Sequence, residues 1–124
     1  MPARSLLPLA LSLLLFTPAH AQGLDRSARQ GIDAHAFSFS GRHCAGGIEA
    51  KPGSEATPGQ FKIGALIMDE AMKEAAAKDK TVGFRSSFND KDLYRATVTT
   101  PKGSMFVMMY LSGGKTFVYT CDLK

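Results

Sequence analysis

The sequence predicts an α+β fold, an antiparallel meander of four or five strands with one helix packed on one face and one disulfide. Three observations lead to this prediction. Residues 57–80 carry a helix-start signal and a helical repeat, and residues 82–123 alternate apolar runs with short turns. One cysteine, Cys44, precedes both regions, and the other, Cys121, lies near the end of the second. Connections of two to four residues force neighbouring strands to run antiparallel.

The first 21 residues have the pattern of a secretory signal peptide. Arg4 precedes an apolar run over residues 6–16, and Ala19 and Ala21 supply the small side chains of a cleavage site. The run is about half the roughly 20 residues that a membrane-spanning helix needs. We therefore expect cleavage near Ala21, no membrane span, and a single small α+β domain over residues 22–124, soluble in the periplasm or secreted.

Charge and cysteine content narrow the partners and the compartment. The formal net charge is +4, without a dense run of Lys or Arg, so nucleic acid is not an expected partner. In an oxidising compartment the simplest pairing of the two cysteines is one disulfide between Cys44 and Cys121. On the chain-entropy model, closing a loop of that length stabilises the fold by about 4 kcal/mol.

The region before the helix offers only short signals. Residues 22–33 are polar and are expected to fray or to lie on the surface. Residues 35–41, HAFSFSG, alternate Phe37 and Phe39 with serines, which predicts a short half-buried strand. Residues 45–59 are rich in Gly, Pro and Ala and predict a loop, long enough to be a candidate binding loop.

The helix has a clear start and a clear apolar side. Thr57 is the expected N-cap, Pro58 takes the first helical position, and Gln60 completes a capping box. Residues 78–80, KDK, place cations near the negative end of the helix dipole. Apolar residues recur at steps of three and four in a stripe that should pack on the sheet, comprising Phe61, Gly64, Ala65, Met68, Met72 and Ala75, widened by Ile63, Ile67 and Ala71.

The remainder of the chain predicts four strands with a definable register. Their expected ranges are Val82–Phe88, Leu93–Thr100, Met105–Leu111 and Thr116–Leu123. A two-residue turn at Gly113-Gly114 pairs Tyr110 with Phe117, Met108 with Tyr119 and Phe106 with Cys121. The turn at Pro101-Lys102 pairs Thr97 with Phe106, and a four-residue loop at 89–92 pairs Phe88 with Leu93 and Phe84 with Thr97.

This register divides the side chains between two faces. The face carrying Phe84, Phe88, Phe106 and Met108 is the expected core face, covered by the helix. The opposite face also has an apolar centre, which either the N-terminal region or the Gly-rich loop covers, or which a partner or second copy covers. Its candidate partner-binding residues are Tyr94, Met105, Val107, Met109, Leu111 and Val118.

Two short motifs suggest chemistry but do not support it. GGKT at 113–116 lacks the first glycine of a phosphate-binding loop and precedes a strand instead of a helix. His35 and His43 are weak candidates for a metal site beside Cys44, because a half-cystine has no thiolate to offer. We find no paired general acid and base, and we expect no cofactor.

The leading functional hypothesis is a non-catalytic binding module, an inhibitor or toxin-immunity protein that binds another protein, with a homodimer as a further possibility. One alternative is a periplasmic carrier of a small apolar ligand or a metal. A second alternative is a small hydrolase with an unrecognised site. In outline, the order of elements resembles cystatin-type and β-lactamase-inhibitor-type scaffolds, and this likeness rests on element order alone.

Overall fold

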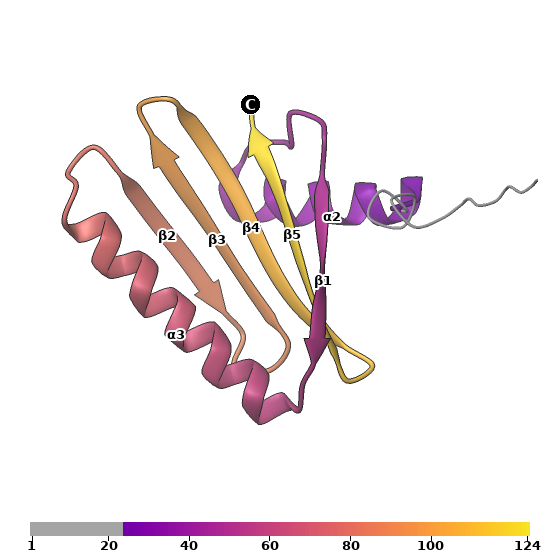
Figure 1. Ribbon diagram of the computed structural model, residues 1–124. Helices are drawn as coiled ribbons and strands as arrows, with labels where there is room; N and C mark the ends of the chain where they lie inside the picture. Colours follow the sequence, from indigo (N-terminus) through magenta and orange to yellow (C-terminus); the bar gives the residue numbers. More distant parts are fainter. Residues whose placement is uncertain (1–23) are drawn as a thin grey trace, which may run out of the picture.

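The computed structural model describes residues 24–124, which form a five-stranded antiparallel sheet with one helix on each face (Figure 1). The predicted signal peptide lies outside the described residues. The elements in chain order are α2 (Arg26–Ser40), β1 (Glu49–Glu55), α3 (Pro58–Ala77), β2 (Gly83–Phe88), β3 (Leu93–Thr100), β4 (Gly103–Ser112) and β5 (Lys115–Leu123). The predicted α+β class, the meander and the disulfide between Cys44 and Cys121 are confirmed.

The four strands β2 to β5 form the predicted meander. A fifth strand, β1, pairs with β5 at the edge of the sheet opposite β2. The sheet order is β1-β5-β4-β3-β2, so the last strand lies inside the sheet and β1 forms one edge. The region predicted as a loop over 45–59 therefore contains a strand. Its register with β5 shifts between Pro52 and Glu55, where Gly53 approaches the carbonyl oxygen of Thr116 so closely that a Cβ would overlap it.

The strand predicted over 35–41 is wrong, because these residues form the second half of α2. Asp25 caps the helix by accepting a hydrogen bond from the Ala28 N–H at 2.7 Å, and Gly41 ends it with φ 76°. Ile32 and Ala36 are buried four residues apart, which is a helical spacing. The alternation of Phe37 and Phe39 spans only a few residues, and the helical spacing of Ile32 and Ala36 determines the structure instead.

The predicted helix is confirmed at its start and close to its end. Thr57 Oγ1 accepts from the Gln60 N–H at 3.1 Å, and Gln60 Oε1 accepts from the Thr57 N–H at 2.9 Å, which completes the capping box. Phe61 and Ala65 are buried on the sheet side. Ile63 and Ile67, predicted to widen the buried stripe, are instead 60% and 64% exposed.

The register is confirmed for β3, β4 and β5 and wrong by one residue for β2. Phe106 lies opposite Thr97 and Cys121, as predicted. Phe88 lies opposite Tyr94, not Leu93, because the connection holds one residue more than predicted. Asp90 takes φ 65° there, and Asn89 Oδ1 accepts hydrogen bonds from three backbone N–H groups.

Because of this one-residue shift in the register of β2, α3 packs on the face of the sheet opposite to the predicted one. Phe84 and Phe88 join the face of Tyr94 and Ala96, where Ala65 of α3 packs against them. The face with Phe106 and Met108 is covered by Ile32 and Ala36 of α2. In Figure 1, α3 runs along β2 while α2 crosses the opposite side of the sheet beside β4, β5 and β1.

Candidate binding surfaces

The six predicted partner-binding residues lie on the face of the sheet that α3 covers in part. Tyr94 and Val107 are buried. Met109, Leu111 and Val118 are half-buried, and Met105 is 38% exposed. The apolar centre of this face is therefore roofed by the chain itself over β2 and β3, and it stays partly open over β4 and β5.

Tyr94 fixes the position of α3 on the sheet. Its phenol donates a hydrogen bond to Asp69 Oδ1 at 2.7 Å, and Lys73 pairs with Asp69 Oδ2 at 2.8 Å. Burial and the hydrogen bond to the Asp69 carboxylate raise the pKa of Tyr94. Burial alone would raise the pKa of Asp69, but donors from Lys73, Ser86 and Tyr94 together lower it. The carboxylate is thus held ionised between helix and sheet.

The part of this face that α3 leaves uncovered forms an apolar strip with a polar rim. We define the open strip as Met105, Met109, Leu111 and Val118. Lys51 lies opposite Val118 on β1, and Asp122 lies opposite Met105 on β5. An apolar centre inside a charged rim is the usual anatomy of a protein–protein interface.

A groove of about 390 Å³ separates the open strip from the first two turns of α3. Phe61 and Gly64 line it from the helix, and Met109 and Thr116 line it from the sheet. A Cβ at Gly64 would meet nothing within 4 Å, so the helix backbone is accessible there. The groove can accept one or two side chains of another molecule.

The outer side of α3 is a second apolar surface. Two of its residues, Ile63 and Ile67, belong to the stripe that the sequence predicts to be buried. We define the outer patch as Ile63, Leu66 and Ile67, which are 60%, 47% and 64% exposed. The signal was present, because the inward positions Phe61, Ala65 and Met68 lie on the opposite side of a helical wheel. A stripe of nine apolar residues was too wide for one side of a helix.

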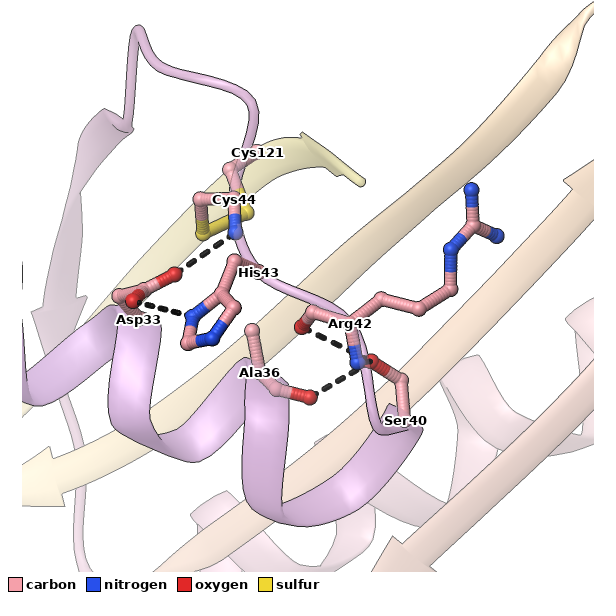
Figure 2. The surroundings of a disulfide bond; sticks show 7 residues. All are labelled: Asp33, Ala36, Ser40, Arg42, His43, Cys44 and Cys121. Carbon is pink, nitrogen blue, oxygen red and sulfur yellow. Dashed lines mark hydrogen bonds and ion pairs between the residues drawn. A yellow bond between two sulfur atoms is a disulfide. The ribbon is translucent and has the colours of Figure 1, made fainter. Parts of the chain in front are cut away.

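The disulfide lies beside a polar clamp that joins α2 to the end of the sheet (Figure 2). Asp33 Oδ1 accepts from the Cys44 N–H at 2.7 Å, and Asp33 Oδ2 contacts His43 Nδ1 at 2.8 Å. The Cys44 hydrogen bond, more than the His43 pair, lowers the pKa of Asp33 against the opposing effect of burial. The His43 ring stacks on Phe37, with 4.5 Å between the ring centroids.

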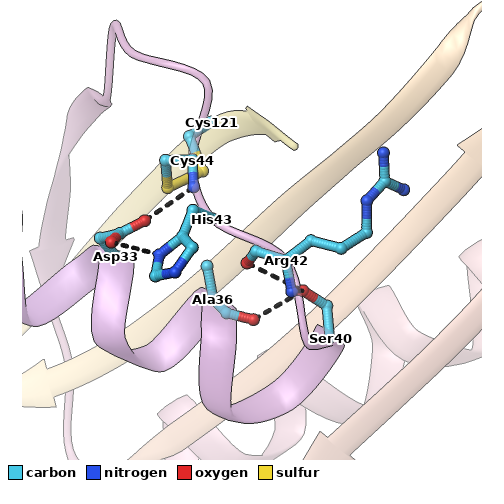
Figure 3. A network of polar contacts seen from close by, with 7 residues as sticks. All are labelled: Asp33, Ala36, Ser40, Arg42, His43, Cys44 and Cys121. Carbon is cyan, nitrogen blue, oxygen red and sulfur yellow. Dashed lines mark hydrogen bonds and ion pairs between the residues drawn. A yellow bond between two sulfur atoms is a disulfide. The ribbon is translucent and has the colours of Figure 1, made fainter. Parts of the chain in front are cut away.

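Serine and arginine complete this clamp at the end of α2 (Figure 3). Ser40 Oγ donates to the Ala36 carbonyl at 2.6 Å and accepts from the Arg42 N–H at 3.1 Å. Arg42 then reaches the sheet, donating to the buried Ser104 Oγ at 2.8 Å and to the Lys124 carbonyl at 3.1 Å. These contacts hold the segment between α2 and β1 against β5.

The weak metal candidates do not come together in one site. His43 contacts Asp33, whereas burial, and then the positive charge of Arg95, lowers the pKa of His35. Within residues 24–124, no group of three or more His, Cys, Asp or Glu side chains is placed to hold a metal ion. Within the GGKT sequence, Gly113 and Gly114 form the predicted β4–β5 turn, with φ 59° and 75°, and Lys115 and Thr116 begin β5.

A hollow lies between α2, the segment after it and Lys124. It measures about 640 Å³, and its lining includes the basic side chains of Arg26, Arg29 and Lys124 and the carboxylate of Asp33. It does not lie between a helix and the sheet, where a carrier of an apolar ligand would bind its cargo. None of the helices in residues 24–124 is long and apolar enough to cross a membrane.

Comparison with protein-family models, with curated proteins and with solved structures finds no significant match to this chain. Functional inference therefore rests on the two apolar surfaces and on the chemistry of the described residues.

Proposed function

We propose that the protein is a non-catalytic binding module of the periplasm or cell exterior, of the inhibitor or immunity-protein type, which binds another protein through the open strip. The observation that carries the proposal is that α3 roofs only part of an apolar sheet face. Met105, Met109, Leu111 and Val118 are left partly exposed inside a charged rim. Closing such a surface with a partner removes apolar area from water.

The shape of the surface favours a protein over a small ligand as the occupant. The exposed apolar side chains spread across two neighbouring strands, and the groove beside them has room for only one or two side chains. A small molecule gains affinity from a cavity that surrounds most of its surface. A protein partner instead covers a broad strip and inserts one anchor residue into the groove.

Location outside the cytoplasm and the absence of catalysis belong to the same proposal. The signal-like N-terminus and the disulfide support an oxidising compartment. The pairs that could suggest chemistry have structural explanations, since Asp33 binds the Cys44 N–H and His43 stacks on Phe37. Both cysteines of the chain are in the disulfide, so neither supplies a nucleophile.

The test is affinity capture from an extract of the source organism's periplasm or culture medium, comparing the wild type with Val118→Lys. We expect a protein that the wild type retains and the variant loses, because a lysine would place a charge in the apolar centre. Tyr110→Lys is the matched control, since Tyr110 is exposed on the opposite face. Retention of the same proteins by the wild type and Val118→Lys would contradict the proposal.

A further inference from the structure

The outer patch of α3 requires an explanation separate from the open strip. Three large aliphatic side chains occupy one turn of a helix on its solvent side, at positions 63, 66 and 67. The solvent side of a surface helix is normally polar. Isoleucine is also a weaker helix former than Lys, Glu or Ala, so helix propensity gives no reason for Ile63 and Ile67.

The charges that flank the patch are arranged so that the surface complements itself. Lys62 lies one turn before the centre of the patch, and Glu70 and Glu74 follow it toward the helix C-terminus, all of them exposed. If a second α3 packs antiparallel about Leu66, Lys62 of each helix lies opposite Glu70 of the other. Lys73, which lies on the same stretch, pairs with Asp69 of its own helix. A parallel arrangement would place like charges side by side.

We propose that two copies of this chain associate through the outer patch, with their α3 helices antiparallel and Leu66 near the two-fold axis. The Ile63, Leu66 and Ile67 side chains form the centre, and Lys62 of each copy pairs with Glu70 of the other. This contact is isologous and closes as a dimer. Antiparallel helices also bring the opposite ends of their dipoles together.

The contact of one helix per subunit places the dimer at the small end of interface sizes. Interfaces below about 1,200 Å² are characteristic of weak or transient complexes. Association should therefore depend on protein concentration, within the range that sedimentation equilibrium measures. The open strip lies on the sheet and is not used in this contact, so the dimer and the proposed protein binding are independent.

Sedimentation equilibrium of the purified protein over a range of concentrations tests the dimer. We expect the wild type to be a concentration-dependent dimer, and Ile67→Glu to raise its dissociation constant by about tenfold or more. Tyr110→Glu is a matched control, because Tyr110 is exposed on the far face of the sheet, and it should leave the dissociation constant unchanged. A wild type that is monomeric at every concentration overturns the proposal.

Exchanging the charges at positions 62 and 70 tests the antiparallel arrangement. Recovery of affinity in the double variant cannot result from misfolding. Lys62→Glu and Glu70→Lys should each weaken the dimer by about twofold or more, and the double variant should regain the wild-type affinity. Thermal unfolding shows that each variant is folded. A double variant no tighter than either single variant overturns the arrangement, and Val118→Lys should leave the dimer intact whether or not it abolishes protein capture.

Discussion

At the scale of single residues, the phenol of Tyr94 links α3 to the sheet. Tyr94 is 1% exposed, packs edge-on against Phe88, and reaches Asp69 on the helix with its hydroxyl. A buried tyrosine whose hydroxyl group is hydrogen-bonded contributes buried apolar area, and its hydrogen bond also orients the element that it contacts. The sequence predicts Tyr94 on a partner surface because the register predicted for β2 differs by one residue from the observed one and puts Phe84 and Phe88 on the other face.

Tyr94→Phe should destabilise the protein by about 1–2 kcal/mol, because it leaves Asp69 without one of its donors while preserving the packing. Urea unfolding followed by far-ultraviolet circular dichroism measures the change. Tyr110→Phe is the control, since that tyrosine is exposed on the opposite face. Equal stability of Tyr94→Phe and the wild type would show that the phenol does not hold the helix.

Asp33 gives the clamp beside the disulfide a dependence on acid. Its folded pKa lies below the ordinary value of 3.8, so its contribution is present above that pH and is lost as pH falls through the lower folded value. Asp33→Asn should therefore lower the melting temperature near neutral pH, and the gap to the wild type should narrow below about pH 4. Asp122→Asn, at an exposed position, is the control. A gap that stays constant as pH falls would refute this role.

At the scale of elements, the strong local signals were predicted and the distributed ones were not. The capping box of α3 and the Gly113-Gly114 turn each lie within a few residues and each fixes a backbone conformation, so both were identified. The signal for α2 is spread over four turns, from Asp25 as N-cap through Ile32 and Ala36 to Gly41. Two alternating phenylalanines were a shorter and misleading pattern.

The candidate site could be predicted only as far as its register. The pairing of β3 with β4 and that of β4 with β5 follow from tight turns. The predicted register therefore places the members of the open strip correctly on one face. Which helix covers that face depends on the conformation of Asn89 and Asp90, where one extra residue exchanges the faces of β2. The coverage of a sheet by helices is a tertiary property that no local pattern encodes.

The edge strand β1 offers a test at this scale through Gly53. Gly53→Ala should destabilise the fold by about 1–3 kcal/mol, because the added Cβ overlaps the Thr116 carbonyl and must push β1 away from β5. In this variant, the rate of amide hydrogen exchange should increase more in β1 than in β3. Gly64→Ala, where a Cβ meets nothing, should instead stabilise α3 by about 0.5–1 kcal/mol. Unchanged exchange in β1 would contradict the close approach.

At the scale of the whole molecule, the disulfide joins the segment that follows α2 to the strand β5. Cys44 and Cys121 are 77 residues apart, and the bridge lies in the cluster where α2 packs on the sheet. Replacing both cysteines with serine should cost about 4 kcal/mol of unfolding free energy on the chain-entropy model. Reductant should lower the melting temperature of the wild type toward that of the double variant and leave the variant unchanged. A wild type insensitive to complete reduction would contradict this.

The interior position of β5 decides when the fold can assemble. The last strand pairs with β4 on one side and with β1 on the other, and it carries Cys121. Without β5, β1 has no neighbouring strand, Cys44 has no partner sulfur, and α2 lacks Cys121 and Leu123 in the cluster it packs against. The pairings of β2 with β3 and of β3 with β4 do not involve β5, whereas β1, the disulfide and the packing of α2 all require it.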